Sequence, residues 1–173
     1  HPASLDYKKD SSFLIGLEPQ KRGHKLFYYS PLELSLKNGK LSAPCAPLQF
    51  RRKKDAYFTL GAFEETDLTT FDIILMRQDF NNPSLYNTIT HILDHISDQT
   101  LILNDPTGVR ESPEKLLITH FPELAPPTLI TRNLDKIREF QKKHPNLILK
   151  PLNGFGGMDV YHIKPNDPNL QAV

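Results

Sequence analysis

Strand-like apolar segments alternate with an amphipathic helical segment in the middle of this chain, and this alternation limits the possible folds more than any other feature. Residues 71–76 (Phe-Asp-Ile-Ile-Leu-Met) and residues 101–103 (Leu-Ile-Leu) each predict a buried strand. Between them, residues 83–97 carry apolar side chains at helical spacing on one face. This order is typical of an α/β domain whose helices cover a largely parallel sheet. We expect that domain to span residues 1–111.

The first 70 residues predict smaller elements of the same domain. Residues 10–22 predict a helix with Asp10 or Ser11 as its N-cap. The apolar side chains that this helix is expected to bury are Phe13, Leu14 and Leu17. Residues 25–29 predict a strand, and Asn38-Gly39 predicts the turn of a hairpin.

The pattern changes in the last third of the chain, where we expect a second unit over residues 112–173. A helix is predicted to begin there with Ser112 as its N-cap. A strand over residues 128–130 and a helix over residues 134–143 follow, and a glycine-rich hairpin ends the unit. These elements form an incomplete α+β unit, so we expect the chain to be a fragment.

One lysine and three glycines follow the apolar residues 147–149 and predict a site for a polyphosphate. Lys150 would supply a positive charge at a strand end, and Gly154, Gly156 and Gly157 would let backbone N–H groups approach phosphate oxygens. The β-branched and aromatic residues that come next predict a second, antiparallel strand rather than a helix. The segment is therefore neither a P-loop nor a dinucleotide-binding loop. The alternative is an ordinary glycine-rich turn.

Composition argues against several classes of protein. Lysine and arginine (21) nearly balance aspartate and glutamate (20), and a net charge of +1 disfavours a nucleic-acid partner. The basic run at residues 51–54 lacks interleaved aromatic residues and predicts a solvated loop. No apolar run approaches the roughly 20 residues that span a bilayer, so we expect no membrane partner. The single cysteine, Cys45, cannot form an internal disulfide and fits the reducing cytoplasm.

Three sets of polar residues are candidates for binding, and each has a simpler explanation. Lys115 lies one turn into a predicted helix, where its charge interacts unfavourably with the helix dipole and a bound anion would offset that interaction. The alternative is a solvated surface lysine. Arg77 follows a strand at the edge where α/β sheets bind ligands, so it is a candidate for ligand binding. The alternative is a salt bridge at the end of the strand. Asp10, Ser11 and Ser12 either cap the first helix or meet an anionic substrate.

Metal binding by the residues of this chain is not expected. His91 and His95 have the spacing of two zinc ligands on a helix, but they fall away from its apolar face. Neither a cysteine nor a glutamate is placed beside them to complete a site.

Several motifs recur in the order in which one enzyme family carries them. They are Asp-Ser-Ser-Phe (10–13), Arg-Gly-His (22–24), Ile-Leu-Met-Arg (74–77), Glu-Lys-Leu (114–116), Pro-Thr-Leu-Ile-Thr-Arg (127–132), Ile-Leu-Lys-Pro-Leu (148–152) and Gly154, Gly156 and Gly157. On these motifs the chain resembles, from one end to the other, the N-terminal part of the bacterial glutathione synthetases, which are ATP-grasp ligases.

The resemblance implies a pre-ATP-grasp, Rossmann-like domain that binds substrate, followed by part of an ATP-grasp domain that forms a nucleotide lid. In the family, ATP phosphorylates the carboxylate of γ-glutamylcysteine, and the amine of glycine attacks the acyl phosphate. Phosphorylation turns a poor electrophile into one with a good leaving group. The resemblance also implies Mg²⁺, a homo-oligomer, and metal ligands beyond Val173. We expect residues 1–173 to be inactive on their own.

Individual roles follow from the resemblance. The residues that would bind ATP are Lys115, Lys150, Gly154, Gly156 and Gly157. The residues that would face γ-glutamylcysteine are Asp10, Ser11, Ser12 and Arg77. In this assignment Arg77 pairs with a substrate carboxylate, and no residue of the chain is expected to be catalytic.

The chain departs from the family after Arg77. Where the family has Arg-Lys-Asp-Pro-Pro, this chain has Arg-Gln-Asp-Phe-Asn at residues 77–81, which affects substrate contacts from that loop. Two alternatives therefore stay open. One is another ATP-grasp carboxylate-amine ligase, and the other is a nucleotide-binding module without catalytic activity.

Overall fold

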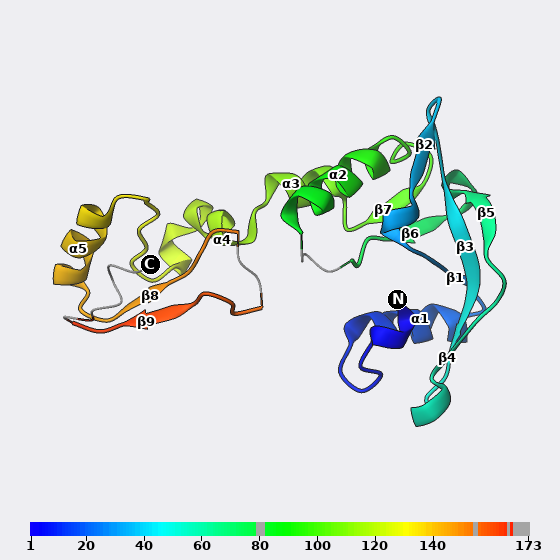
Figure 1. The fold of residues 1–173 in the computed structure, drawn as a ribbon, viewed down its shortest axis with the longest axis horizontal. Coiled ribbons are helices and arrows are strands. Elements are labelled where there is room, and N and C mark those ends of the chain that lie inside the picture. The colour runs from blue at the N-terminus through cyan, green and yellow to red at the C-terminus, as the bar shows by residue number, and fades with distance from the viewer. Residues whose placement is uncertain (79–81, 154–155, 166, 168–173) are drawn as a thin grey trace. The chain divides into compact units, whose positions relative to one another are not determined.

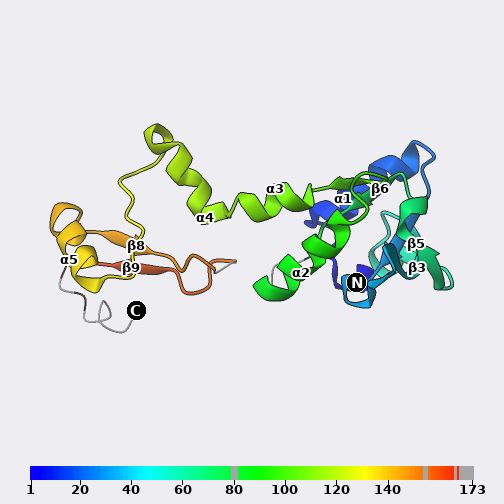
Figure 2. The ribbon, with the colours of Figure 1, turned by 90° about the horizontal axis from the view of Figure 1, so that it is seen from above.

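The structure is a computed structural model that describes residues 1–78, 82–153, 156–165 and 167. It consists of two compact units, His1–Arg110 and Glu111–Val173, and each is considered by itself (Figures 1 and 2). Helices and sheets occur in both units, so the predicted mixed α/β class is confirmed.

An antiparallel sheet forms the first half of unit 1, with the long strand β3 (Lys40–Phe50) at its centre (Figure 1). The strands that pair with β3 are β1 (Leu26–Tyr29), β2 (Ser35–Lys37), β4 (Phe58–Leu60) and β5 (Glu64–Asp67). Asn38 and Gly39 connect β2 to β3 with φ of 51° and 78°, which confirms the predicted hairpin turn. The antiparallel pairing differs from the largely parallel sheet that we expected, because hairpin turns and loops rather than crossover helices connect these strands.

The predicted parallel strands form a separate two-stranded sheet in the same unit. Strands β6 (Ile73–Leu75) and β7 (Leu101–Leu103) pair in parallel, and helix α2 (Pro83–Asp94) makes the crossover between them. Helix α3 (Pro106–Glu111), which the sequence pattern did not predict, follows β7 and ends at the boundary of the unit.

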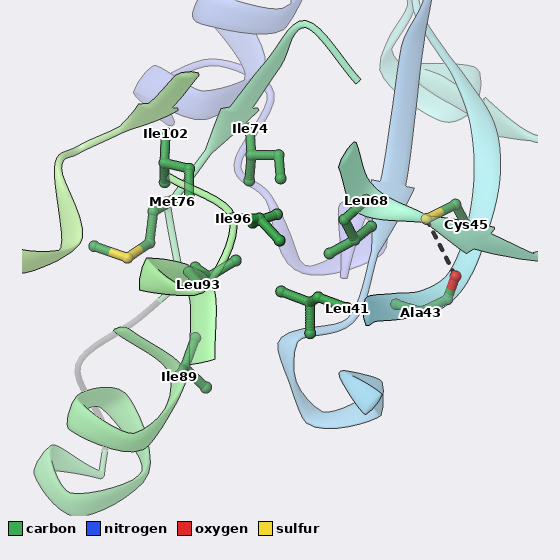
Figure 3. Packing of buried hydrophobic residues seen from close by; sticks show 10 residues of the cluster. All are labelled: Leu41, Ala43, Cys45, Leu68, Ile74, Met76, Ile89, Leu93, Ile96 and Ile102. Atoms are coloured by element: carbon green, nitrogen blue, oxygen red, sulfur yellow. Dashed lines mark hydrogen bonds between the residues drawn. The ribbon is translucent and has the colours of Figure 1, made fainter. Parts of the chain in front are cut away.

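The main core lies between α2 and the strands of unit 1 (Figure 3). Ile89, Leu93 and Ile96 are buried, which confirms the predicted apolar face of the helical segment. They share one cluster with residues of the two sheets and of the segments that follow β5 and β6: Leu41, Ala43, Cys45, Leu68, Ile74, Met76 and Ile102. The prediction that residues 71–76 form a buried strand is wrong for one face, because Ile73 is 51% exposed. A strand alternates its side chains between two faces, and only one face of β6 packs against the core.

Helix α1 (Ser11–Lys21) packs against β3 and forms a second, aromatic core. Phe13 and Leu17 are buried beside Phe50. The predicted burial of Phe13 and Leu17 is therefore confirmed. Leu14 is 45% exposed, so its predicted burial is wrong; the next position is rotated about 100° around the helix from Phe13. The side-chain amide of Gln20 fixes the strand by bonding both the backbone N–H (2.8 Å) and C=O (2.9 Å) of Phe50.

Tyr29 gives unit 1 a predictable sensitivity to alkaline pH. Burial of its hydroxyl, and secondarily the charge of Cys45, raises the pKa of Tyr29 above its ordinary value of 10.0. The unfolded chain therefore loses this proton first, and stability falls above about pH 10, by up to about 1.4 kcal/mol per pH unit for a single group. We expect Tyr29→Phe to reduce that slope in urea unfolding measured from pH 8 to 11. Identical slopes in the two proteins would contradict this account.

Unit 2 contains a helix that covers a two-stranded antiparallel hairpin. Helix α5 (Leu134–Lys143) packs on β8 (Leu147–Leu149) and β9 (Tyr161–Ile163) (Figure 1). Leu147 and Ile163 are buried beneath it. The predicted helix and the predicted antiparallel hairpin are both confirmed.

Two predictions for unit 2 are wrong. Helix α4 (Glu114–Leu117) has Pro113, not Ser112, at its N-cap, and no side chain caps it. It continues only as a 3₁₀ turn over Ile118–His120. Residues 128–130 form no strand, since no neighbouring strand is assigned to pair with them in the described part of the chain.

Asn133 stabilises the start of α5. Its Oδ1 accepts hydrogen bonds from the backbone N–H groups of Asp135 (2.9 Å) and Lys136 (3.2 Å). We expect Asn133→Ala to lower the free energy of unfolding by about 1 kcal/mol. Asn133→Ser should retain most of that stabilisation, because serine also caps helices. Urea unfolding monitored by circular dichroism would measure both, and equal losses would contradict a capping role.

Candidate functional site

Arg77 and two serines come together although 65 positions separate them in the sequence. Arg77 follows β6, and its Nε donates a hydrogen bond to Ser12 Oγ at 3.1 Å. Its Nη2 donates to Ser11 Oγ. The contact forms because the carboxyl end of β6 lies beside the first turn of α1. Asp79, the acidic residue of the salt-bridge alternative, lies outside the described residues.

This cluster has donors available for an anionic group. Arg77 is exposed, and its guanidinium carries five N–H donors, of which the two serine hydroxyls engage two. Each hydroxyl that accepts from arginine keeps its own hydrogen for a ligand. The first turn of α1 adds the positive end of a helix dipole. The cluster therefore fits an anionic group such as a carboxylate.

Asp10 lies beside the cluster but has a structural role. Its Oδ1 accepts a hydrogen bond from the backbone N–H of Ser12 at 2.7 Å, which is the geometry of a helix N-cap. The capping alternative thus accounts for Asp10, whereas the two serines direct their hydroxyls toward Arg77.

Lys150, Gly156 and Gly157 lie in the segment that connects the two strands of the hairpin in unit 2. Lys150 directly follows β8 and is exposed. Gly156 and Gly157 have φ of 59° and 78°, and a Cβ added to either would meet nothing within 4 Å. These left-handed conformations favour glycine, and they leave the backbone open to a ligand. Gly154 lies outside the described residues. The residues that the structure describes here fit a phosphate group.

Lys115 belongs to the same unit as Lys150. It lies in α4 and is half-buried. Since α4 has only four residues, the predicted effect of a helix dipole on this lysine is small.

Other candidate sites are explained by structure. Cys45 is buried, its thiol donates to the C=O of Ala43 (3.4 Å), and burial raises its pKa, so it is not an activated nucleophile (Figure 3). Residues 51–54 are exposed, as predicted for a solvated loop. Across the described ranges there is no group of three or more His, Cys, Asp or Glu that could hold a metal ion. In the same ranges no helix is long and apolar enough to cross a membrane.

A hollow of about 230 Å³, lined in part by Gln78, was not predicted. Its lining includes Gln78, Asn82 and Tyr86 together with apolar side chains. The Nε2 of Gln78 is buried and has no hydrogen-bond partner among the described residues. Alternation of side chains along the extended segment could have placed Gln78 opposite Arg77, but the segments that close the hollow are distant in sequence.

Comparison with known proteins identifies the family. The model of "Prokaryotic glutathione synthetase, N-terminal domain" matches residues 1–110, and the model of "Prokaryotic glutathione synthetase, ATP-grasp domain" matches residues 114–173. The chain belongs to the prokaryotic glutathione synthetase family. The resemblance inferred from its motifs is therefore confirmed.

Relatives named glutathione synthetase match the chain along its whole length. The protein of Brucella melitensis is 43% identical over 173 residues, which are 100% of this chain and 55% of that protein. The protein of Bradyrhizobium diazoefficiens is 46% identical over 171 residues, which are 99% of this chain and 54% of that protein. That of Yersinia pestis is 40% identical over 99% of this chain. The chain thus spans about half the length of these glutathione synthetases.

Proposed function

We propose that this chain is part of a glutathione synthetase, an enzyme that ligates γ-glutamylcysteine to glycine with consumption of ATP. The observation that carries the proposal is the cluster of Arg77, Ser11 and Ser12. It offers bidentate and hydroxyl donors to a carboxylate at the strand end where α/β sheets bind ligands. Unit 1 is accordingly a substrate-binding domain, and Asp10 supports it by capping α1.

The second unit is proposed to hold the phosphates of ATP. Lys150 and Lys115 supply positive charge, and Gly154, Gly156 and Gly157 supply backbone donors in a segment that closes over the nucleotide. When bound, ATP transfers its γ-phosphoryl group to a substrate carboxylate, and an amine then displaces phosphate to form the amide. The work of these residues is to orient the phosphates, offset their charge and exclude water.

Several properties belong to the longer protein and are part of the same proposal. Mg²⁺ would be bound by the phosphates of ATP together with carboxylates outside the described ranges. We propose a homo-oligomer in the cytoplasm, with no nucleic-acid or membrane partner, which agrees with the balanced charge.

The function is tested by measuring ADP release by the full-length protein. Release should require γ-glutamylcysteine and glycine together. Release with another carboxylate and amine, and not with this pair, would favour a different ATP-grasp carboxylate-amine ligase. Binding of ATP without turnover on any such pair would favour the non-catalytic nucleotide-binding module.

A further inference from the structure

The hollow that Gln78 lines has mostly apolar walls and one unsatisfied polar group. Leu32, Leu85 and Ile89 contribute apolar walls, and Gln78, Asn82 and Tyr86 contribute polar atoms. At about 230 Å³ it is large enough for one amino-acid side chain but not for a nucleotide.

Among the polar residues of the lining, Gln78 has the donor that the described fold leaves unused. Its Nε2 is buried without a partner in the described chain, and an unsatisfied buried N–H is unfavourable. The Oδ1 of Asn82, by contrast, already accepts from the backbone N–H of Leu85 at 3.1 Å. The hollow therefore favours a ligand that is small, weakly polar and able to accept one hydrogen bond.

Arg77 and Gln78 are neighbours, so one ligand can contact both. The Cα atoms of adjacent residues are about 3.8 Å apart. Arg77 contacts the serines of α1, while Gln78 lines the hollow toward α2. A ligand of dipeptide size that lies across the end of β6 would reach the guanidinium with a carboxylate and the hollow with a side chain.

We propose that this hollow receives the cysteinyl side chain of γ-glutamylcysteine, and that Gln78 Nε2 donates a hydrogen bond to its sulfur. The inference rests on the proposed function. The carboxylates and the ammonium group of this substrate are charged, and burial against leucine and isoleucine would be costly for them. The CH₂–SH group is weakly polar, and its sulfur is a weak acceptor. Gln78 is thus a residue that determines specificity for a thiol.

The test compares two substrates on the full-length protein. γ-Glutamyl-α-aminobutyrate carries a methyl group where γ-glutamylcysteine carries the thiol. Gln78→Leu should lower kcat/KM for γ-glutamylcysteine about fivefold and leave kcat/KM for the analogue nearly unchanged, because only the thiol loses a hydrogen bond. Equal changes for the two substrates, or no change for either, would overturn the inference.

A second variant tests the position of the subsite. Leu32 is 71% exposed, so Leu32→Phe should fold normally while filling the hollow. It should raise KM at least threefold for both dipeptides and leave KM for ATP unchanged. Leu124→Phe, at an exposed leucine of unit 2, is the matched control and should change neither the KM for the dipeptides nor the KM for ATP. An unaltered dipeptide KM in Leu32→Phe would place the side chain elsewhere.

The wild-type protein separates this inference from the proposed function. If it releases no ADP with γ-glutamylcysteine and glycine, both fail. If it does, and Gln78→Leu keeps the wild-type ratio of kcat/KM between thiol and analogue, only the subsite fails.

Discussion

Lys150→Ala is expected to lower kcat/KM for ATP about 100-fold or more in the full-length protein. Lys150 is exposed where β8 ends, and the open backbone of Gly156 and Gly157 belongs to the same hairpin. Removal of one preorganised group that stabilises charge in a transition state costs about 10²- to 10³-fold in other enzymes. Phosphoryl transfer depends strongly on such groups because its charge is spread over phosphate oxygens. Glycine-dependent release of ADP measures the effect.

Lys143→Ala is the matched control for this experiment. Lys143 is the last residue of α5, is also exposed and lies in the same unit, so the substitution removes the same charge. We expect its activity to stay within about twofold of wild type, since a solvated surface charge contributes little. Comparable losses in the two variants would show that net charge, rather than a phosphate contact, explains the loss in Lys150→Ala.

The sequence predicts unit 2 best where the determinants are local. The N-cap at Asn133 and the helical spacing that follows it place α5, and a strand followed by glycines and β-branched residues places the hairpin. Each of these signals acts within a few residues. The same local reasoning fails at Ser112, because Pro113 takes the N-cap position and leaves α4 with a single turn.

Features that depend on distant contacts were harder to predict. The exposed face of β6 and the antiparallel arrangement around β3 follow from how segments pair, and periodicity does not specify that. The contact of Arg77 with Ser11 and Ser12 joins two loci 65 positions apart, and the resemblance to a family, not spacing, indicated that they share a site. The role that we propose for Gln78 was not predicted, because the hollow that it lines is formed with residues of α2 and of the segment near Leu32.

Arg77→Ala should reduce kcat/KM for γ-glutamylcysteine about 100-fold, mainly through KM. The guanidinium is the charged group of its cluster, and loss of a charge-assisted bidentate contact removes about two strong hydrogen bonds. Ser12→Ala should cost less, about fivefold, because it removes one orienting contact and retains the charge. KM for ATP should be unchanged in both variants.

Arg77→Lys discriminates between charge and geometry at this position. Lysine keeps the charge but cannot contact a carboxylate with two parallel N–H donors, nor span both Ser11 and Ser12 as Arg77 does. We therefore expect it to recover less than a tenth of the activity that Arg77→Ala loses. Arg138→Ala, which removes an exposed arginine paired with Asp135 on α5, should have no effect on either substrate. Full recovery by lysine would mean that Arg77 acts only as a positive charge, and the bidentate assignment would then be wrong.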